Sequence, residues 1–252
     1  MPVILILLTI IILVLSFIFA MLGLGGAMLY IPVFHWFGFD FKSVAIPTGL
    51  LLNGITAFSA SVYYLKQKMV DVRGAIPLVV TSFIGAPVGA YFTKMVSTDV
   101  LILLFAVSMV FAGGKMLVSS GQPDKTAMMP AQKRMIVMGV GGFFIGFIAG
   151  LLGVGGGFLF VPMMIAMGYE TKIAAATSAF VVIFSSFSGF AGHIAEGHFN
   201  WSLMAMTSVA VIIGSQIGAK VMKEKMKAKW IKQMFAVVLL GVAVKLIWKL
   251  YV

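Results

Sequence analysis

The chain has 252 residues, of which 62% are hydrophobic and only 10% are charged. Soluble domains are nearer half apolar and about a quarter charged, so this composition excludes a soluble enzyme and a disordered chain. The net charge is +11, but the cations stand between apolar runs as membrane anchors and do not indicate nucleic-acid binding. The chain has no Cys, which excludes disulfides and Cys-ligated metals.

Eight apolar stretches, taken in chain order, predict an all-α polytopic membrane protein. Six have about 20 residues, the length that spans a ~30 Å hydrocarbon core. The other two are too long for one crossing, and each carries glycines followed by a proline, so we expect each to divide into two shorter helices. The first stretch has no cationic start and no small-residue cleavage site, which favours a retained helix over a cleaved signal. The stretches are 2–37, 44–65, 74–93, 98–118, 135–167, 173–194, 201–219 and 231–251.

The halves 1–118 and 135–252, separated by the polar linker 119–134, form an internal repeat. The shift along the chain that takes Gly23 to Gly153 also brings further glycine, leucine, proline and lysine residues of the first half onto identical residues of the second half. We call this shift the repeat offset. Further on, one residue is lost and GAPVGA at 85–90 matches GSQIGA at 214–219. The paired positions are Gly23, Gly25, Gly26, Leu29, Pro32, Gly38 and Lys42 with Gly153, Gly155, Gly156, Leu159, Pro162, Gly168 and Lys172.

The distribution of cations decides between two topologies. If each long stretch crosses once, the repeats are parallel and nine cations lie on each face. If each is a hairpin that enters and leaves on one face, the repeats are inverted and the cations divide fourteen to four, with only Lys42, Lys94, Lys245 and Lys249 on the poorer face. Cytoplasmic loops are rich in Lys and Arg, so we prefer the hairpins, each followed by three transmembrane helices. The linker is then cytoplasmic and both termini are outside. Long, kinked single helices are the alternative.

The glycine clusters are candidate anion-binding turns. Inverted repeats with broken helices place transporter sites near the bilayer midplane. Amides freed at Gly25, Gly26, Gly155, Gly156 and Gly157 could bind an anion, with help from the dipole of a helix that begins there. Glycine also lets an oxyanion approach the main chain closely. The alternative is that these glycines only permit tight packing.

Polar side chains follow each hairpin and complete the candidate site. Thr48 and Asn53 lie in the stretch after the first hairpin, and the matching stretch contains Thr177, Ser178, Ser185, Ser186 and Ser188. Thr177 and Ser178 are favoured, because they match Pro47 and Thr48 across the repeat. They could solvate an anion, or they could simply bond to helix carbonyls. His193, the deepest ionisable residue, could carry a coupling proton or lie at the membrane interface. No carboxylate pair or His cluster indicates hydrolysis, a metal or another cofactor.

Two small-residue motifs predict close helix packing. These are Gly85-x-x-x-Gly89 and Gly214-x-x-x-Gly218, in which glycine lets two backbones approach. Gln216, inside the second motif, is the exception that could have a polar role.

With these motifs in view, the chain resembles the TauE/SafE family of sulfite exporters, also called sulfonate permeases. The resemblance covers nearly the whole chain and rests on Gly153-Val154-Gly155-Gly156-Gly157-Phe158-Leu159-Phe160-Val161-Pro162, its first-half copy Gly23 to Pro32, Ala176-Thr177-Ser178 and the paired G-[AS]-x-x-G-A segments. It implies transport of a small sulfur oxyanion or organosulfonate across the bacterial cytoplasmic membrane. Ala27 departs from the pattern, since the second copy has Gly157 there.

Together these features predict a secondary transporter that moves a small anion, sulfite or an organosulfonate, by alternating access. A carrier of another anion, such as a carboxylate, and an anion channel are the alternatives, and the absence of a catalytic constellation argues against an enzyme. The expected partners are the anion, membrane lipid and a coupling proton or sodium ion.

Overall fold

The computed structural model describes residues 2–122, 124, 127–195 and 198–251, and all regular elements among them are helical. Eight helical segments in this part of the chain are long and apolar enough to cross a membrane, so the predicted all-α polytopic architecture is confirmed. The helices are α1 Pro2–Leu22, α2 Ala27–Trp36, α3 Ile46–Lys66, α4 Val72–Thr93, α5 Thr98–Ser120, α6 Ala131–Leu152, α7 Gly157–Ala166, α8 Thr171–His193, α9 Trp201–Lys225 and α10 Ala228–Tyr251, with a π-helical turn η1 at Phe41–Ala45.

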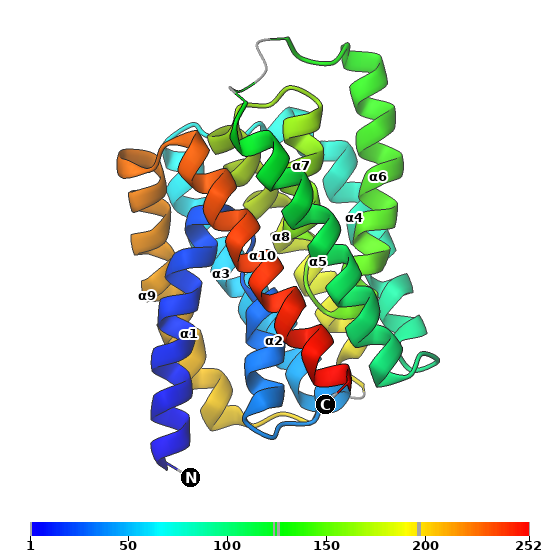
Figure 1. The fold of residues 1–252 in the computed structure, drawn as a ribbon, viewed down its shortest axis with the longest axis vertical. Coiled ribbons are helices and arrows are strands. Elements are labelled where there is room, and N and C mark those ends of the chain that lie inside the picture. The colour runs from blue at the N-terminus through cyan, green and yellow to red at the C-terminus, as the bar shows by residue number, and fades with distance from the viewer. Residues whose placement is uncertain (1, 123, 125–126, 196–197, 252) are drawn as a thin grey trace.

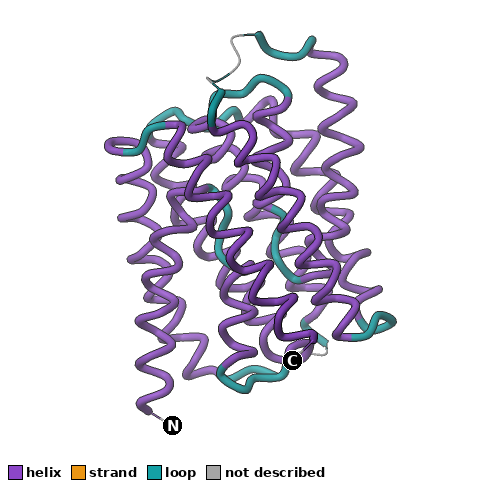
Figure 2. The backbone as a smooth tube through the Cα atoms, in the orientation of Figure 1, coloured by secondary structure: helices purple, strands orange, loops and turns teal. Residues whose placement is uncertain are grey.

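Both overlong stretches divide at their glycines, as the sequence predicts. The arms are unequal, however: α1 and α6 have 21 and 22 residues, whereas α2 and α7 have 10 each. At 1.5 Å per residue a 21-residue helix is about 31 Å long, roughly the thickness of the hydrocarbon core, whereas a 10-residue arm is about half as long. Figure 2 shows the two breaks as loop segments at the middle height of the bundle, far from the loops at its ends.

The loops gather at two opposite ends of the bundle. At the end that we call the linker end, Lys223 contacts Gln67, and Asp124 accepts hydrogen bonds from Thr171. At the other end, the terminal end, Lys42 Nζ donates to the Val96 carbonyl at 2.8 Å. Figure 1 shows the N- and C-termini together at the terminal end, where α2 also finishes. The α1–α2 segment therefore begins and ends on the same side.

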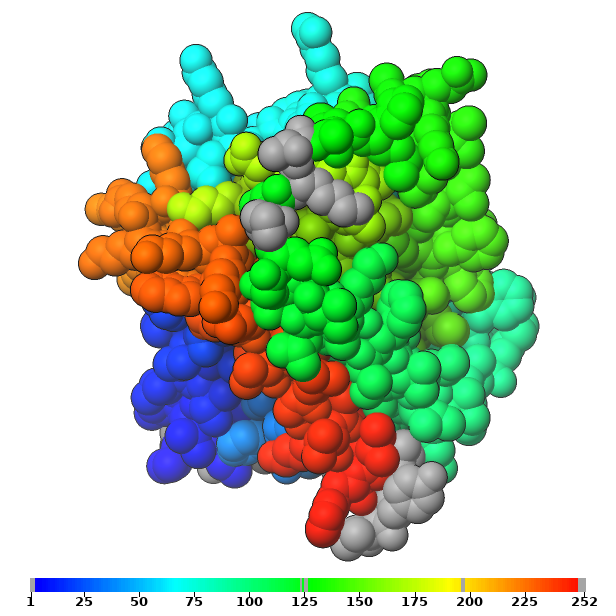
Figure 3. Space-filling view, turned by 45° about the horizontal axis from the view of Figure 1, so that its top comes forward, coloured from blue at the N-terminus to red at the C-terminus, as the bar shows by residue number. Residues whose placement is uncertain are grey.

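Helices of the two halves interleave. The long arm α1 packs on α9 of the second half, while α6 packs on α4 of the first half, and α3 and α5 pack on their counterparts α8 and α10. Figure 3 shows α5 and α10 adjacent on one face. The contact of α1 with α9 and that of α6 with α4 each include one of the small-residue motifs.

The packing role of both glycine motifs is confirmed. A Cβ added at Gly89 of α4 would overlap the carbonyl oxygen of Phe147 in α6. A Cβ added at Gly218 of α9 would overlap the carbonyl oxygen of Phe17 in α1, and the repeat offset pairs Phe17 with Phe147. Gln216 does have a polar partner, because its Nε2 donates to the Ser59 carbonyl of α3 at 2.5 Å.

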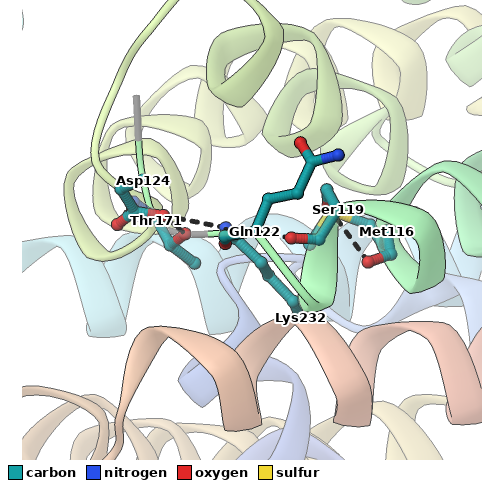
Figure 4. Close-up of polar contacts among 6 residues, drawn as sticks. All are labelled: Met116, Ser119, Gln122, Asp124, Thr171 and Lys232. Carbon is teal, nitrogen blue, oxygen red and sulfur yellow. Dashed lines mark hydrogen bonds and ion pairs between the residues drawn. The ribbon is translucent and has the colours of Figure 1, made fainter. Parts of the chain in front are cut away.

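The linker is fastened to the second half by a buried cation (Figure 4). Lys232 of α10, only 2% exposed, forms a 2.9 Å ion pair with Asp124 and donates to the carbonyls of Ser119 and Gln122. Asp124 also accepts from the Thr171 amide at 2.9 Å and so caps α8. Burial alone would raise the pKa of Asp124, but hydrogen bonds from Thr171 and Lys232 outweigh it and hold that pKa below its ordinary value.

Candidate functional site

The two glycine turns have backbone conformations that favour glycine. Gly25 and Gly26 have φ of 87° and 150°, and Gly155 and Gly156 have φ of 70° and 81°. Side chains with a Cβ rarely adopt these angles, which explains glycine at matching positions of both halves. The turns also touch one another, because a Cβ added at Gly157 would lie 2.6 Å from the carbonyl oxygen of Leu24. All of these residues are buried.

Asn53 of α3 bridges the two turns. Its Oδ1 accepts a 2.8 Å hydrogen bond from the amide of Ala27, the first residue of α2. Its Nδ2 donates at 2.7 Å to Ser186 Oγ of α8, beside the second turn. The side chain is 0% exposed. The polar groups of both turns are thus joined through one amide that the sequence analysis selected.

The second turn has no corresponding cap. The repeat offset pairs Asn53 with Ile183, whose side chain has no acceptor, and α7 has no side-chain cap. Among the described residues, none accepts a hydrogen bond from the amides of Gly155, Gly156, Gly157 or Phe158. The first amides of a helix carry its positive dipole end and need acceptors, so this turn presents several donors to one small region.

Serine hydroxyls surround the α7 N-terminus. Ser185 Oγ donates to the Gly155 carbonyl at 2.7 Å, and Ser178 Oγ donates to the Gly157 carbonyl at 3.4 Å. The Ser186 hydroxyl, which accepts from Asn53, makes no other hydrogen bond in the described chain and retains its own proton for donation. Thr48, the partner of Ser178 in the repeat, is buried and its Oγ1 has no hydrogen-bond partner within the part of the chain that is described.

Thr177 lies apart from the turns. Its Oγ1 accepts from the amide of Asp71, in the loop between α3 and α4 at the linker end. The side chain of Asp71 accepts a 2.8 Å hydrogen bond from the Tyr169 hydroxyl. Burial, reinforced by this bond, raises the pKa of Tyr169, so the phenol remains a donor. A cavity of about 680 Å³, lined by Asp71, Asp124 and Glu170 among others, opens here.

His193, the candidate coupling residue, is buried at the end of α8. The side chain is 4% exposed, and Nε2 lies 3.0 Å from the carbonyl oxygen of Gly150 in α6. The structure therefore places it inside the protein at a contact between the two helices, and its ring spans the junction between α8 and the long arm of the second hairpin.

Ser186 was among the serines that the sequence analysis named, although Thr177 and Ser178 were favoured, whereas Tyr30 was not named there. Tyr30 OH of α2 lies 3.1 Å from Thr56 Oγ1, beside the first turn. The repeat offset that pairs the glycines also pairs Thr56 with Ser186, and both carry hydroxyls. That correspondence is a sequence signal for Thr56 and Ser186, whereas the same offset pairs Tyr30 with Phe160, which has no hydroxyl.

The arrangement suits a small anion. It offers backbone amides, hydroxyls and one carboxamide, and none of the residues that form it carries a charge. Such donors can replace the water around an oxyanion without a fixed cation. Within the described chain, no three His, Asp or Glu side chains come together in a way that could hold a metal ion.

Comparison with known proteins gives one consistent result. A family model described as "Sulfite exporter TauE/SafE" matches residues 8–246. "Probable membrane transporter protein YunE" of Bacillus subtilis is 28% identical, with 91% of this chain and 92% of that protein aligned. "Probable membrane transporter protein y4hK" of Sinorhizobium fredii is 26% identical, over 93% of this chain and 95% of its own length. No solved structure matches with statistical significance.

Proposed function

Because the chain belongs to the sulfite exporter TauE/SafE family and is a multi-pass membrane transporter, we propose that it moves a small anion, sulfite or an organosulfonate, across the cytoplasmic membrane by alternating access. The observation that carries this proposal is the uncapped N-terminus of α7. Its free amides, the Ser186 hydroxyl and the Asn53 carboxamide lie together where the two turns meet.

The anion is held mainly by the second turn. The amides of Gly156 and Gly157 and the proton of Ser186 donate to its oxygens, and the positive end of the α7 dipole adds to the attraction. Asn53 already satisfies the first amide of α2, so the first turn contributes fewer donors. One negative charge is thereby stabilised without a buried Lys or Arg, whose own desolvation would be costly.

The two halves act as inverted repeats that move against each other. This is supported by the reversal of the chain at each glycine turn and by the matched pairing of α1 with α9 and α6 with α4. The closed contact between the buried turns corresponds to an occluded form, from which the site opens alternately to each end. The linker end, which holds most of the loop cations, faces the cytoplasm, and both termini face outward.

Transport by purified protein in liposomes tests the function. We expect saturable flux of labelled sulfite or taurine that an imposed proton or sodium gradient accelerates. Flux of a carboxylate without flux of sulfite or taurine would instead assign a carboxylate as the substrate. An anion channel would instead give flux that follows the Nernst potential without saturation.

A single hydroxyl tests the site. Ser186→Ala removes one donor with little change in shape, and a hydrogen bond to a charged group contributes about 1.5–3 kcal/mol, so anion affinity should fall roughly tenfold or more. Ser120→Ala is the matched control, because that exposed hydroxyl bonds to the Leu117 carbonyl of its own helix. Equal affinities in both folded variants would place the anion elsewhere.

A further inference from the structure

A groove beside α7 is not used by the proposed transport site. It consists of two adjoining spaces of about 630 and 590 Å³, walled by α5 on one side and by α6 and α7 on the other. Both spaces are lined by Phe111, Lys115, Pro162 and Ala166, so they meet at these residues. The walls are otherwise mainly apolar, and exposed side chains such as Val107 and Val118 continue the apolar surface along α5.

Lys115 is the unbalanced charge in this groove. Among the described residues it has no carboxylate, carbonyl or aromatic partner, although it lies within a membrane-spanning helix. Lys232 also lines the groove, but its ammonium is neutralised by Asp124 at 2.9 Å. A cation on an apolar wall needs a counter-charge or contact with water, so Lys115 indicates a ligand with a negative group.

In the other half of the molecule, the lysine that corresponds to Lys115 is covered by an aromatic side chain. Counted from the first residues of α5 and α10, Thr98 and Ala228, Lys115 and Lys245 hold the same position. The Nζ of Lys245 is 3.6 Å from the ring centroid of Trp36. The repeat offset pairs Trp36 with Ala166. In the first hairpin an indole therefore covers the lysine, whereas in the second a methyl group leaves it open. The cavity near Pro32 is correspondingly smaller, about 280 Å³.

We propose that this groove binds an anionic phospholipid, with the lipid phosphate on Lys115 and an acyl chain between α5 and α6–α7. Lys115 lies five residues before Ser120, the last residue of α5, which places it about 8 Å inside that helix end. A lysine side chain at that depth reaches up to the headgroup level. The apolar walls below it, including Ile148 and Leu159, fit a hydrocarbon chain.

Charge favours a lipid over a second copy of the chain. The linker end carries most of the loop cations, and a partner copy would bring the same excess of positive charge to the groove. An anionic lipid supplies the missing negative charge and the apolar surface in one molecule, and such lipids are attracted to cationic segments at a membrane surface.

Native mass spectrometry of the full-length protein, with phosphatidylglycerol or phosphatidylcholine added to the detergent, tests the proposal. The wild type should retain phosphatidylglycerol in preference to phosphatidylcholine. Lys115→Met should reduce that preference about fivefold, as expected for one lysine at a membrane surface. Lys245→Met, which changes the covered lysine, should leave it unchanged.

Ala166→Trp provides a second variant that retains the charge. By analogy with Trp36, the indole should fill the groove and cover Lys115, so lipid retention should fall while the protein stays folded. Equal retention of the two lipids by the wild type, or an unchanged preference in both Lys115→Met and Ala166→Trp, would overturn the proposal. A dimer that Ala166→Trp dissociates without any loss of lipid would assign the groove to a second copy instead.

Discussion

Replacement of Gly89 by alanine should destabilise the protein, whereas the same replacement at Gly139 should not. A Cβ at Gly89 would overlap the Phe147 carbonyl oxygen and lie 2.8 Å from the Leu151 amide nitrogen, both in the backbone of α6. Backbone atoms cannot rotate away, so α4 and α6 must separate. At Gly139, on α6 itself, an added Cβ meets no atom of the described chain within 4 Å.

The magnitude follows from two opposing effects. Alanine favours a helix over glycine by about 1 kcal/mol, and both variants receive this gain. Overpacking costs about 1–3 kcal/mol and applies only to Gly89→Ala. The two variants should therefore differ by about 1–3 kcal/mol, which corresponds to a difference in melting temperature of roughly 5 °C for a protein of this size.

Thermal unfolding of both purified variants in one detergent, followed by the loss of the monodisperse peak in size-exclusion chromatography, measures this difference. Gly218→Ala should behave like Gly89→Ala, because its Cβ would overlap the Phe17 carbonyl of α1. Equal melting temperatures for Gly89→Ala and Gly139→Ala would show that the close approach of α4 and α6 does not hold these helices together.

Three further predictions concern the turns, the linker and the topology. Asn53→Ala leaves the buried Ala27 amide without its acceptor, so the free energy of unfolding should fall by about 1–3 kcal/mol. In a double-mutant cycle with Ser186→Ala, the losses of stability should be non-additive, because the two side chains are hydrogen-bonded. Additive losses would contradict the hydrogen bond from Asn53 to Ser186. Asp124→Asn should lower the melting temperature at pH 7. Because the pKa of Asp124 is depressed in the folded state, the difference from wild type should persist through the ordinary pKa range of an aspartate and disappear only at lower pH. A difference that stays constant with pH would refute the role of its charge. Single cysteines at Ser120 or Lys225 should resist an impermeant thiol reagent in intact cells, and labelling there would reverse the proposed orientation.

Local sequence features predicted the fold well. Glycine and proline act on the backbone within a few residues, so the breaks after Leu22 and Leu152 could be located from composition alone. The unequal arms could not, since apolar length does not show how far each arm extends before it turns. The packing of Gly89 and Gly218 was predictable in kind, but their partners Phe147 and Phe17 depend on how the halves dock.

The candidate site was predicted only in part, because it combines residues far apart in the chain. Asn53 and Ser186 are separated by most of one repeat and the linker, and only tertiary packing brings them together. Thr177 and Ser178 are neighbours in sequence, yet successive residues on a helix point about 100° apart. Ser178 therefore faces the turn at Gly157 while Thr177 faces Asp71.

Counterflow in proteoliposomes tests the central claim most directly, namely that this chain carries a small sulfur oxyanion through the meeting point of its two glycine turns. Vesicles loaded with unlabelled sulfite should accumulate labelled sulfite transiently. Ser186→Ala should need roughly tenfold more sulfite for half-maximal exchange, and Ser120→Ala should match the wild type. Absence of counterflow with sulfite and with taurine, or equal half-maximal concentrations in all three proteins, would contradict the account.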